Sequence, residues 1–361
     1  MIDAPPLPPP TIVAPAPREV SFGRVSGTVP AGTTHVIVRA RGLVVAEFPV
    51  RRRSFTVNPP LPTGNVVVEV TAVDGRNRRS RRSIAPVLSL PPSAAPLVRA
   101  PVLDRPLAAW VDRLRRQYGG TTGIYVENLR TGRGAAWNAG ARFPAASTLK
   151  LAIAVTVLRA LDGKPAAGSE VARLLDAMMV FSDNEAANDL EVWLAGSTSA
   201  GSSRVNETMR AIGLTDSEMY GGYGTRGPSA AAPIPIRLDR QPDFGVGKYT
   251  TAADLSRLAR AVYLAAVGKG PLGRLGVDRS EARYLLWLLS QASDRGKLDR
   301  IVGAKAIVMH KSGWLPMARH DAGIVAYSGG AYVATVMTWQ TARADELAGD
   351  VASRALARFT Q

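Results

Sequence analysis

Three short polar segments of this chain carry residue types that could do hydrolytic chemistry. In the first, Ser147 and Lys150 stand three positions apart at the start of an apolar run with helical spacing. Residues at i and i+3 of a helix lie on one face, so this hydroxyl and this amine can reach each other. A serine hydroxyl becomes a nucleophile when a base takes its proton. A lysine can be that base where burial or neighbouring positive charge lowers its pKa.

The second and third segments supply further polar groups. Ser182, Asp183 and Asn184 follow a predicted apolar helix at residues 171–180, and the string Lys311 to Trp314 ends a predicted strand at 306–309. Taken singly, each segment also fits a structural role, as a helix cap or as a strand end with an exposed lysine. The order and spacing of all three segments together indicate an active site.

The rest of the chain, which must position these segments, has two parts with different sequence patterns. Residues 18–90 show short alternating apolar runs separated by Pro and Gly turns, at 20–29, 35–40, 43–50, 54–57 and 65–73. This pattern predicts a small basic all-β sandwich of immunoglobulin-like length. From residue 102 onward, apolar spacing predicts an amphipathic helix at 103–118 and a closing helix at 342–359, with strands at 121–128, 306–309, 322–327 and 331–338. We predict an α/β (α+β) body with an antiparallel sheet built from both chain ends, flanked by terminal helices, and a separate helical layer.

The chain of 361 residues has room for two domains. We expect a proline-rich spacer over residues 1–17, the β-sandwich over 18–90, a linker over 91–101 and the larger body over 102–361. The spacer and the linker are rich in proline, which favours an extended, semi-rigid polyproline II conformation.

Composition excludes several classes of protein. The chain has no cysteine, which excludes a disulfide scaffold, a thiolate zinc site and a cysteine nucleophile. With only three histidines, we expect no metal and no cofactor. No apolar stretch approaches the roughly 18–20 residues of a membrane span. The start at Met1 lacks the charged and apolar regions of a signal peptide, and we expect a secreted or cell-envelope protein whose signal segment is not part of this chain.

The net charge of +16 prompts a search for an anionic partner. The first hundred residues hold 13 arginines against five acidic residues. This charge fits a protected, solvated sheet edge, a bias of a GC-rich coding sequence, or a docking surface for an anionic polymer. We expect a cell-envelope polymer rather than nucleic acid, because the only aromatic residues there, Phe22, Phe48 and Phe55, fit core positions. A base-stacking platform needs exposed aromatic rings.

Together, the three polar segments resemble the signature of the serine penicillin-recognising enzymes, most closely the class A β-lactamase family. The resemblance extends from about residue 103 to 361 and includes Phe143-Pro144-Ala145 before the first segment. It implies a hydrolase that opens the β-lactam amide through an acyl-enzyme on Ser147, and with it a part in antibiotic resistance. Lys150 then resembles the proton acceptor or relay, and Ser182 the hydroxyl that passes a proton to the leaving nitrogen.

The same resemblance implies five substrate-binding positions. Asn184 resembles the amide that holds the substrate's side-chain carbonyl, and Lys311 with Ser312 resembles the pair that meets its carboxylate. Gly313 gives clearance. The backbone N–H groups of Ser147 and Trp314 would form the oxyanion hole.

One departure from the family pattern leaves the reaction open. Class A enzymes carry a Glu-x-x-Leu-Asn loop between the second and third segments, and this chain has no such string. Glu218 is the first candidate to replace that glutamate, ahead of Asp239 and Asp243, and Arg319 is a candidate second carboxylate contact. Without the loop, two alternatives stay open. The first is a D-Ala-D-Ala-type peptidase, or penicillin-binding protein, which acts on peptidoglycan stem peptides and deacylates slowly. The second is a non-catalytic cell-wall-binding protein.

A rival catalytic arrangement uses a histidine. His310 or His320 with Asp321 could form a triad, but the Gly-x-Ser-x-Gly elbow that such enzymes need is absent from the sequence.

Overall fold

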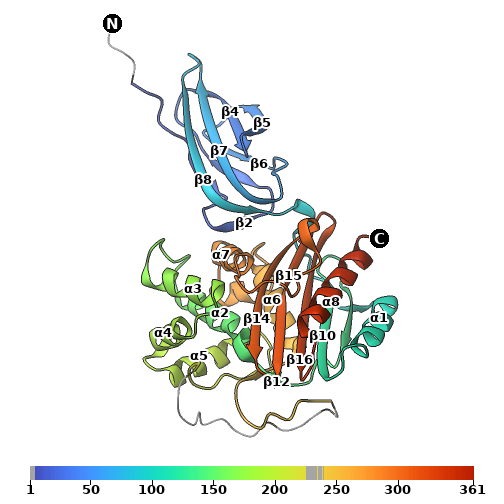
Figure 1. Ribbon diagram of the computed structural model, residues 1–361. Helices are drawn as coiled ribbons and strands as arrows, with labels where there is room; N and C mark the ends of the chain where they lie inside the picture. The colour runs from blue at the N-terminus through green and yellow to red at the C-terminus, as the bar shows by residue number, and fades with distance from the viewer. Residues whose placement is uncertain (1–4, 225–233, 235–237, 239) are drawn as a thin grey trace. The chain divides into compact units, whose positions relative to one another are not determined.

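The computed structural model of the chain describes residues 5–224, 234, 238 and 240–361. The chain divides into two compact units, Met1–Ala94 and Ala95–Gln361 (Figure 1). The division falls inside the segment expected as a linker, and each unit is described by itself.

The first unit is an all-β module, as the sequence predicts. One sheet has the order β1 (Thr11–Ala14), β3 (Val25–Thr28), β6 (Ser54–Val57). The other has the order β2 (Glu19–Ser21), β8 (Arg79–Ser89), β7 (Gly64–Asp74), β4 (Thr33–Ala40), β5 (Leu43–Pro49). Alternate strand residues form the core, among them Val36, Val38, Val68 and Val70, and Phe55 packs with them. Two sheets facing one apolar layer make a sandwich.

The module differs from the expectation in three places. The segment 1–17 is not a free spacer, because β1 pairs antiparallel with β3, Thr11 opposite Thr28. The single run expected at 20–29 is two strands in different sheets, β2 and β3. Strand β8 was not expected because its arginines hide the alternation of apolar residues, although Ile84 and Val87 are buried.

The second unit is built around a six-stranded sheet. Its order is β14 (Ala306–Leu315), β15 (Ala318–Tyr327), β16 (Gly330–Trp339), β10 (Thr121–Asn128), β11 (Arg133–Trp137), β9 (Val102–Leu103). Strand β16 from the end of the chain pairs with β10 from the start of this unit, Trp339 opposite Thr121. The pairing confirms a sheet made from both chain ends. It is antiparallel except at β9, which runs parallel to β11.

The terminal helices α1 (Arg105–Arg115) and α8 (Ala344–Phe359) pack together on the sheet (Figure 1). Leu107, Val111 and Val351 from these helices share one core with Tyr332 of β16. Asp104 caps α1 by accepting a hydrogen bond from the backbone N–H of Leu107. The structure therefore confirms the fold class predicted for this part of the chain.

The remaining helices form the separate layer that the sequence predicts. Helices α2 (Lys150–Ala160), α3 (Glu170–Val180), α4 (Asn184–Ala195) and α5 (Thr198–Ala211) gather beyond β14, while α6 (Ala252–Ala265) packs on β10, β15 and β16 and α7 (Arg279–Ser290) on β14 (Figure 1). All of Lys150 to Leu158 is buried, so α2 is the central helix of the layer. The pair β12 (Phe143–Pro144) and β13 (Tyr249–Thr250) lies beside its start. Among the described helices, none is long and apolar enough to cross a membrane.

Candidate active site

Ser147 lies in the 3-10 turn η2 (Ala146–Leu149), which leads directly into α2. The hydroxyl and the backbone N–H of Thr148 both donate to Ala145 O, at 2.6 and 3.1 Å, and fix the turn. Ala146, just before the serine, has φ of 47°, a conformation that costs an L-residue free energy and persists only where the surroundings hold it. Ser147 is half-buried and Lys150 is fully buried, and they lie three residues apart where the turn leads into α2.

Strand β14 approaches this turn at Gly313. A Cβ atom at position 313 would lie 3.0 Å from Ala146 Cβ, from Ser147 N and from Thr148 Cγ2. A side chain at this position would push these atoms apart by a few tenths of an ångström, so glycine favours the approach. The backbone of Gly313 therefore packs against the backbone of Ser147, and Trp314 is the next residue of β14.

Lys150 is held by the segment between α3 and α4. Its Nζ donates to Ser182 O and to Asn184 Oδ1, both at 2.6 Å. Asp183 caps α4 by accepting the Ala186 N–H at 2.8 Å, which ties this segment down. Within the described residues the Ser147 hydroxyl has no hydrogen-bond partner, and catalytic hydrogen bonds often tighten only when substrate is bound.

The third segment joins the second through Lys311. Lys311 Nζ donates to Ser182 Oγ and to Ser312 O, both at 2.9 Å. The Ser312 hydroxyl donates to Asp294 Oδ2 at 2.5 Å, and Lys297 forms an ion pair with the same carboxylate. Asp294 and Lys297 carry no motif and were not expected in the site. Burial acts to raise the pKa of Asp294, but hydrogen bonds from Lys297 and Ser312 hold it below its usual value.

The two lysines of the site have pKa values near neutrality. Burial lowers the pKa of Lys150 to about 8, with the charge of Asp183 acting against the shift and that of Lys248 acting with it. Burial and the charge of Lys150 lower the pKa of Lys311 to about 7. An amine with such a pKa is uncharged often enough at neutral pH to accept a serine proton.

Sequence reasoning missed Tyr223 and Lys248. Lys150 Nζ and Lys248 Nζ each lie 4.7 Å from the centroid of the Tyr223 ring, within cation–π range. The side chain of Asn188, on α4, holds the backbone of Tyr223 through two hydrogen bonds of 2.6 and 3.0 Å, and Lys248 Nζ donates to Gly222 O at 2.8 Å. The glycine-rich string 221–224 was the only sequence signal here, and it predicts a turn rather than a role.

A buried carboxyl group lies beneath Lys248. Glu191, on α4, is fully buried, and its Oε1 accepts the Ser202 hydroxyl at 2.6 Å. Burial raises the pKa of Glu191 to about 7, against the opposing effects of Ser202 and of the Lys248 charge. Glu191 and Lys248 therefore interact electrostatically.

The structure places Glu218 away from Lys150. Asn206, on α5, donates to Glu218 Oε1 at 2.7 Å, and Arg210 lies 3.7 Å from the same oxygen. The Glu218 backbone forms a bridge with Tyr249. Among the described residues, no carboxylate contacts Lys150 Nζ.

The structure describes two of the other candidates, and neither forms a described bond with Ser147, Lys150, Ser182 or Lys311. Arg319 is opposite Trp314 across the strand pair, and its guanidinium forms an ion pair of 3.0 Å with Asp345 at the start of α8. Asp243 is exposed, and Asp239 lies outside the described residues.

Neither histidine of the rival triad contacts a serine hydroxyl in the described part of the chain. His310 Nδ1 lies 2.8 Å from both carboxylate oxygens of Asp321, and both residues are buried. His320 Nε2 lies 2.8 Å from Pro144 O, and its Nδ1 accepts the Thr338 N–H at 3.1 Å. Burial lowers the pKa of His320 to about 4, so it is neutral at pH 7. Over the same described residues, no group of three or more His, Asp or Glu could hold a metal ion.

The chain matches the model of the β-lactamase enzyme family over residues 106–166 and 162–359. This match begins in α1, so it does not extend over the β-module, and the immunoglobulin-like resemblance of that module stays a prediction. No curated protein matches the chain.

Several solved structures share the fold. The structure of PBP-A has a TM-score of 0.57 and 22% identity, over 73% of this chain and 99% of that one. A PBP-A mutant in an acyl-enzyme complex with penicillin G has a TM-score of 0.55 and 21% identity, over 73% of this chain and 99% of that one. The β-lactamase from Sphaerobacter thermophilus has a TM-score of 0.52 and 21% identity, over 70% and 96% of the two chains.

Proposed function

The chain belongs to the β-lactamase enzyme family, and from that premise we propose that it is a serine hydrolase acylated on Ser147 by β-lactams. One observation carries the proposal: Ser147, Lys150, Ser182 and Lys311 come from three separate segments and lie in one site, with Lys150 and Lys311 both bonded to Ser182. These residues are the ones that acyl transfer needs, namely a nucleophile, a base and a proton relay.

The proposed acylation runs through these groups in order. Uncharged Lys150 takes the Ser147 hydroxyl proton, and Oγ attacks the lactam carbonyl carbon. The backbone N–H groups of Ser147 and Trp314 stabilise the negative charge on the carbonyl oxygen. The carbon–nitrogen bond then breaks, and Ser182 Oγ gives its proton to the departing nitrogen. Ser182 Oγ then takes back a proton from the Lys150 ammonium, which balances the protons of the step. Lys311 stays bonded to Ser182 Oγ, where the negative charge of the substrate carboxylate would favour its protonated form.

A covalent adduct is the direct test. Intact-protein mass spectrometry after incubation with a penicillin should show the mass of one acyl group, and Ser147→Ala should show none. No adduct with a broad panel of penicillins, cephalosporins and carbapenems would contradict the proposal and leave cell-wall binding without catalysis. Sedimentation of Ser147→Ala with purified cell wall measures that binding alone.

A second candidate concerns the fate of the acyl-enzyme. The position of Glu218, held by Asn206 and Arg210, favours a slow-deacylating, penicillin-binding type of enzyme over a fast β-lactamase. General-base activation of the hydrolytic water contributes about 10²–10⁴ in rate, so its loss leaves a long-lived adduct. The matching natural substrate is a peptidoglycan stem peptide that ends in D-Ala-D-Ala.

Two assays separate the candidates. Rapid-mixing kinetics with a chromogenic cephalosporin should show a stoichiometric burst and then little turnover, and a stem-peptide analogue should release D-Ala. Many turnovers per second after the burst, with no D-Ala release, would instead identify a β-lactamase.

We also propose that the β-module holds the enzyme near an anionic envelope polymer outside the cytoplasm. A groove of about 620 Å³ on this module is lined by Arg39, Arg79 and Arg81, with Glu69 as its acidic residue. The full chain should sediment with anionic wall polymer at low salt and not at high salt, because salt screens exposed charges. Changing Arg79 and Arg81 to Gln should abolish this binding, whereas Arg204→Gln, an exposed arginine of α5, should leave it unchanged.

A further inference from the structure

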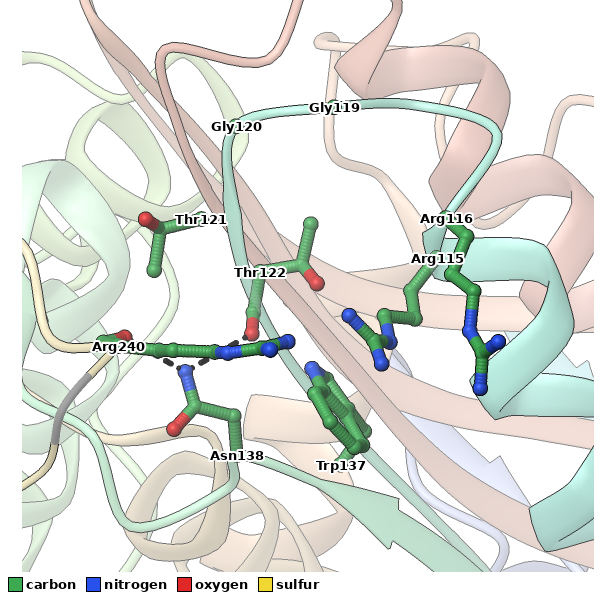
Figure 2. A pocket seen from close by; sticks show the side chains of 9 residues that line it. All are labelled: Arg115, Arg116, Gly119, Gly120, Thr121, Thr122, Trp137, Asn138 and Arg240. Carbon is green, nitrogen blue, oxygen red and sulfur yellow. Dashed lines mark hydrogen bonds between the residues drawn. The ribbon is translucent and has the colours of Figure 1, made fainter.

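A second cavity lies in the β-lactamase-like unit, away from Ser147. It has a volume of about 440 Å³ and opens where α1 ends and β10 begins. Strands β15 and β16 separate β10 from β14, which carries the third segment of the active site. Its lining, drawn in Figure 2, consists of Arg115, Arg116, Gly119, Gly120, Thr121, Thr122, Trp137, Asn138 and Arg240. None of these residues belongs to the proposed catalytic machinery.

Two of the arginines are held in place by one indole ring. Arg115 Cζ lies 3.7 Å and Arg240 Cζ 5.4 Å from the centroid of Trp137, and Figure 2 shows both side chains extending toward that ring. Asp112 bonds to Arg115 Nη2 at 2.8 Å and also to Arg116. The guanidinium groups are therefore ordered before a ligand arrives, which reduces the entropy lost on binding.

The backbone of the cavity is also fixed. Asn138 Nδ2 donates to Thr122 O at 3.1 Å and to Arg240 O at 2.8 Å, and so ties the Arg240 segment to β10. A Cβ atom on Gly120 would lie 2.6 Å from Gln340 O and from Trp339 O, so this position must be glycine. The rim at Gly119 and Gly120 thus has no side chains, which leaves the arginines open to a ligand.

The charge and shape of the cavity select one kind of ligand group. Three guanidinium groups line the cavity. Asp112 is the one carboxylate that forms an ion pair with any of them among the described residues. Guanidinium groups bind phosphate oxygens through two parallel hydrogen bonds. Because arginines already cover Trp137, its ring is not free to stack on a nucleobase. The volume suits a small phosphorylated molecule or one unit of a phosphodiester chain.

We propose that this cavity is a phosphate-binding site, distinct from the acylation site, and that Arg116 and Arg240 bind the phosphate group, while Arg115, held by Asp112 and Trp137, adds its positive charge. The phosphate can come from a small phosphorylated solute or from a phosphodiester polymer. These sources share the chemistry that the cavity recognises, and they differ in how affinity depends on ligand length.

Calorimetric titration of the full chain at low salt tests the proposal, with glycerol 3-phosphate and a short glycerol-phosphate oligomer as probes. We expect saturable binding that Arg240→Gln and, separately, Arg116→Gln weaken about tenfold or more, since charged hydrogen bonds are lost. Tighter binding of the oligomer identifies a polymer as the ligand, and equal binding identifies a solute. The acylation rate with a chromogenic cephalosporin should stay that of the unmodified protein in both variants.

A matched control variant lies on α8, the helix that packs against α1. Arg354, on α8, is exposed and lies 5.8 Å from the ring of Trp110, so Arg354→Gln removes the same charge from an arginine–tryptophan pair outside the cavity. This variant should bind both probes as the unmodified protein does. Equal weakening in Arg354→Gln would show a general charge effect and overturn the proposal. Unchanged binding in both Arg240→Gln and Arg116→Gln, or no saturable binding of either probe, would overturn it as well.

Discussion

The active site differs between its motif-bearing side and the side formed by the loop at residues 213–224. On the first side, Lys150 and Lys311 both bond to Ser182, at 2.6 and 2.9 Å. On the second side, Lys150 meets the ring of Tyr223, and Glu218 is bonded to Asn206 instead. Lys150, Ser182 and Lys311 are therefore in contact with one another, while no described carboxylate bonds to Lys150. The comparison separates the two half-reactions and predicts that mutations will affect them separately.

The largest expected effect is on the motif-bearing side. Lys150→Met should slow acylation by about 10²–10⁴, because the serine loses its base. Stopped-flow acylation by a fluorescent penicillin measures the rate. Lys269→Met, which changes an exposed lysine in a turn, is the matched control and should acylate normally. An unchanged rate in Lys150→Met would show that another group takes the proton.

The next largest effect is expected on the loop side, from a substitution that adds a carboxylate beside Lys150. Tyr223→Glu places a carboxylate beside Lys150 and Lys248, and deacylation should become faster, by up to about 10². The decay of the acyl-enzyme, followed by mass spectrometry, measures this rate. Tyr223→Phe keeps the ring, carries no base and should leave the decay slow. If both variants decayed equally fast, the ring itself would control access of water to the ester.

A smaller effect is expected from the charge of Lys248, which acts on the pKa of Lys150. Since Lys150 must be uncharged to act as a base, acylation should fall about tenfold per pH unit below its pKa of about 8. Lys248→Met removes a positive charge that lowers the pKa of Lys150, so that pKa should rise and the acidic limb of the pH profile should move to higher pH. A profile of acylation rate against pH shows the shift. A lower rate with an unmoved limb would give Lys248 a purely structural role.

The smallest expected effect is at Glu218. Glu218→Gln keeps the side-chain oxygen that accepts from Asn206, so the loop should keep its place. The deacylation rate should change less than about twofold, since the carboxylate does not act on water. A large decrease would make Glu218 the general base and would return the chain to the fast β-lactamase mechanism.

Local sequence features predicted much of the fold. The amphipathic helix at 103–118 appears as α1 with Leu107, Val111 and Leu114 buried, because apolar spacing alone selects the face that packs. Alternation likewise predicted β4, β5, β6 and β7. It did not reveal β8, in which arginines occupy three of the six exposed positions, or β1, which lies in the proline-rich segment and pairs with β3.

The residues of the active site also divide into those found from the sequence and those that only the structure reveals. Ser147 with Lys150, Ser182 to Asn184 and Lys311 to Trp314 were found from the sequence because together they resemble the three short motifs of the serine penicillin-recognising enzymes. The sequence by itself also excluded thiol chemistry. Tertiary structure alone decided that Glu218 faces α5, that Tyr223 and Lys248 lie beside Lys150, and that Arg115 and Arg240 meet at Trp137. These contacts join residues far apart in the chain, and the packing of whole elements, rather than any local pattern, sets their distances.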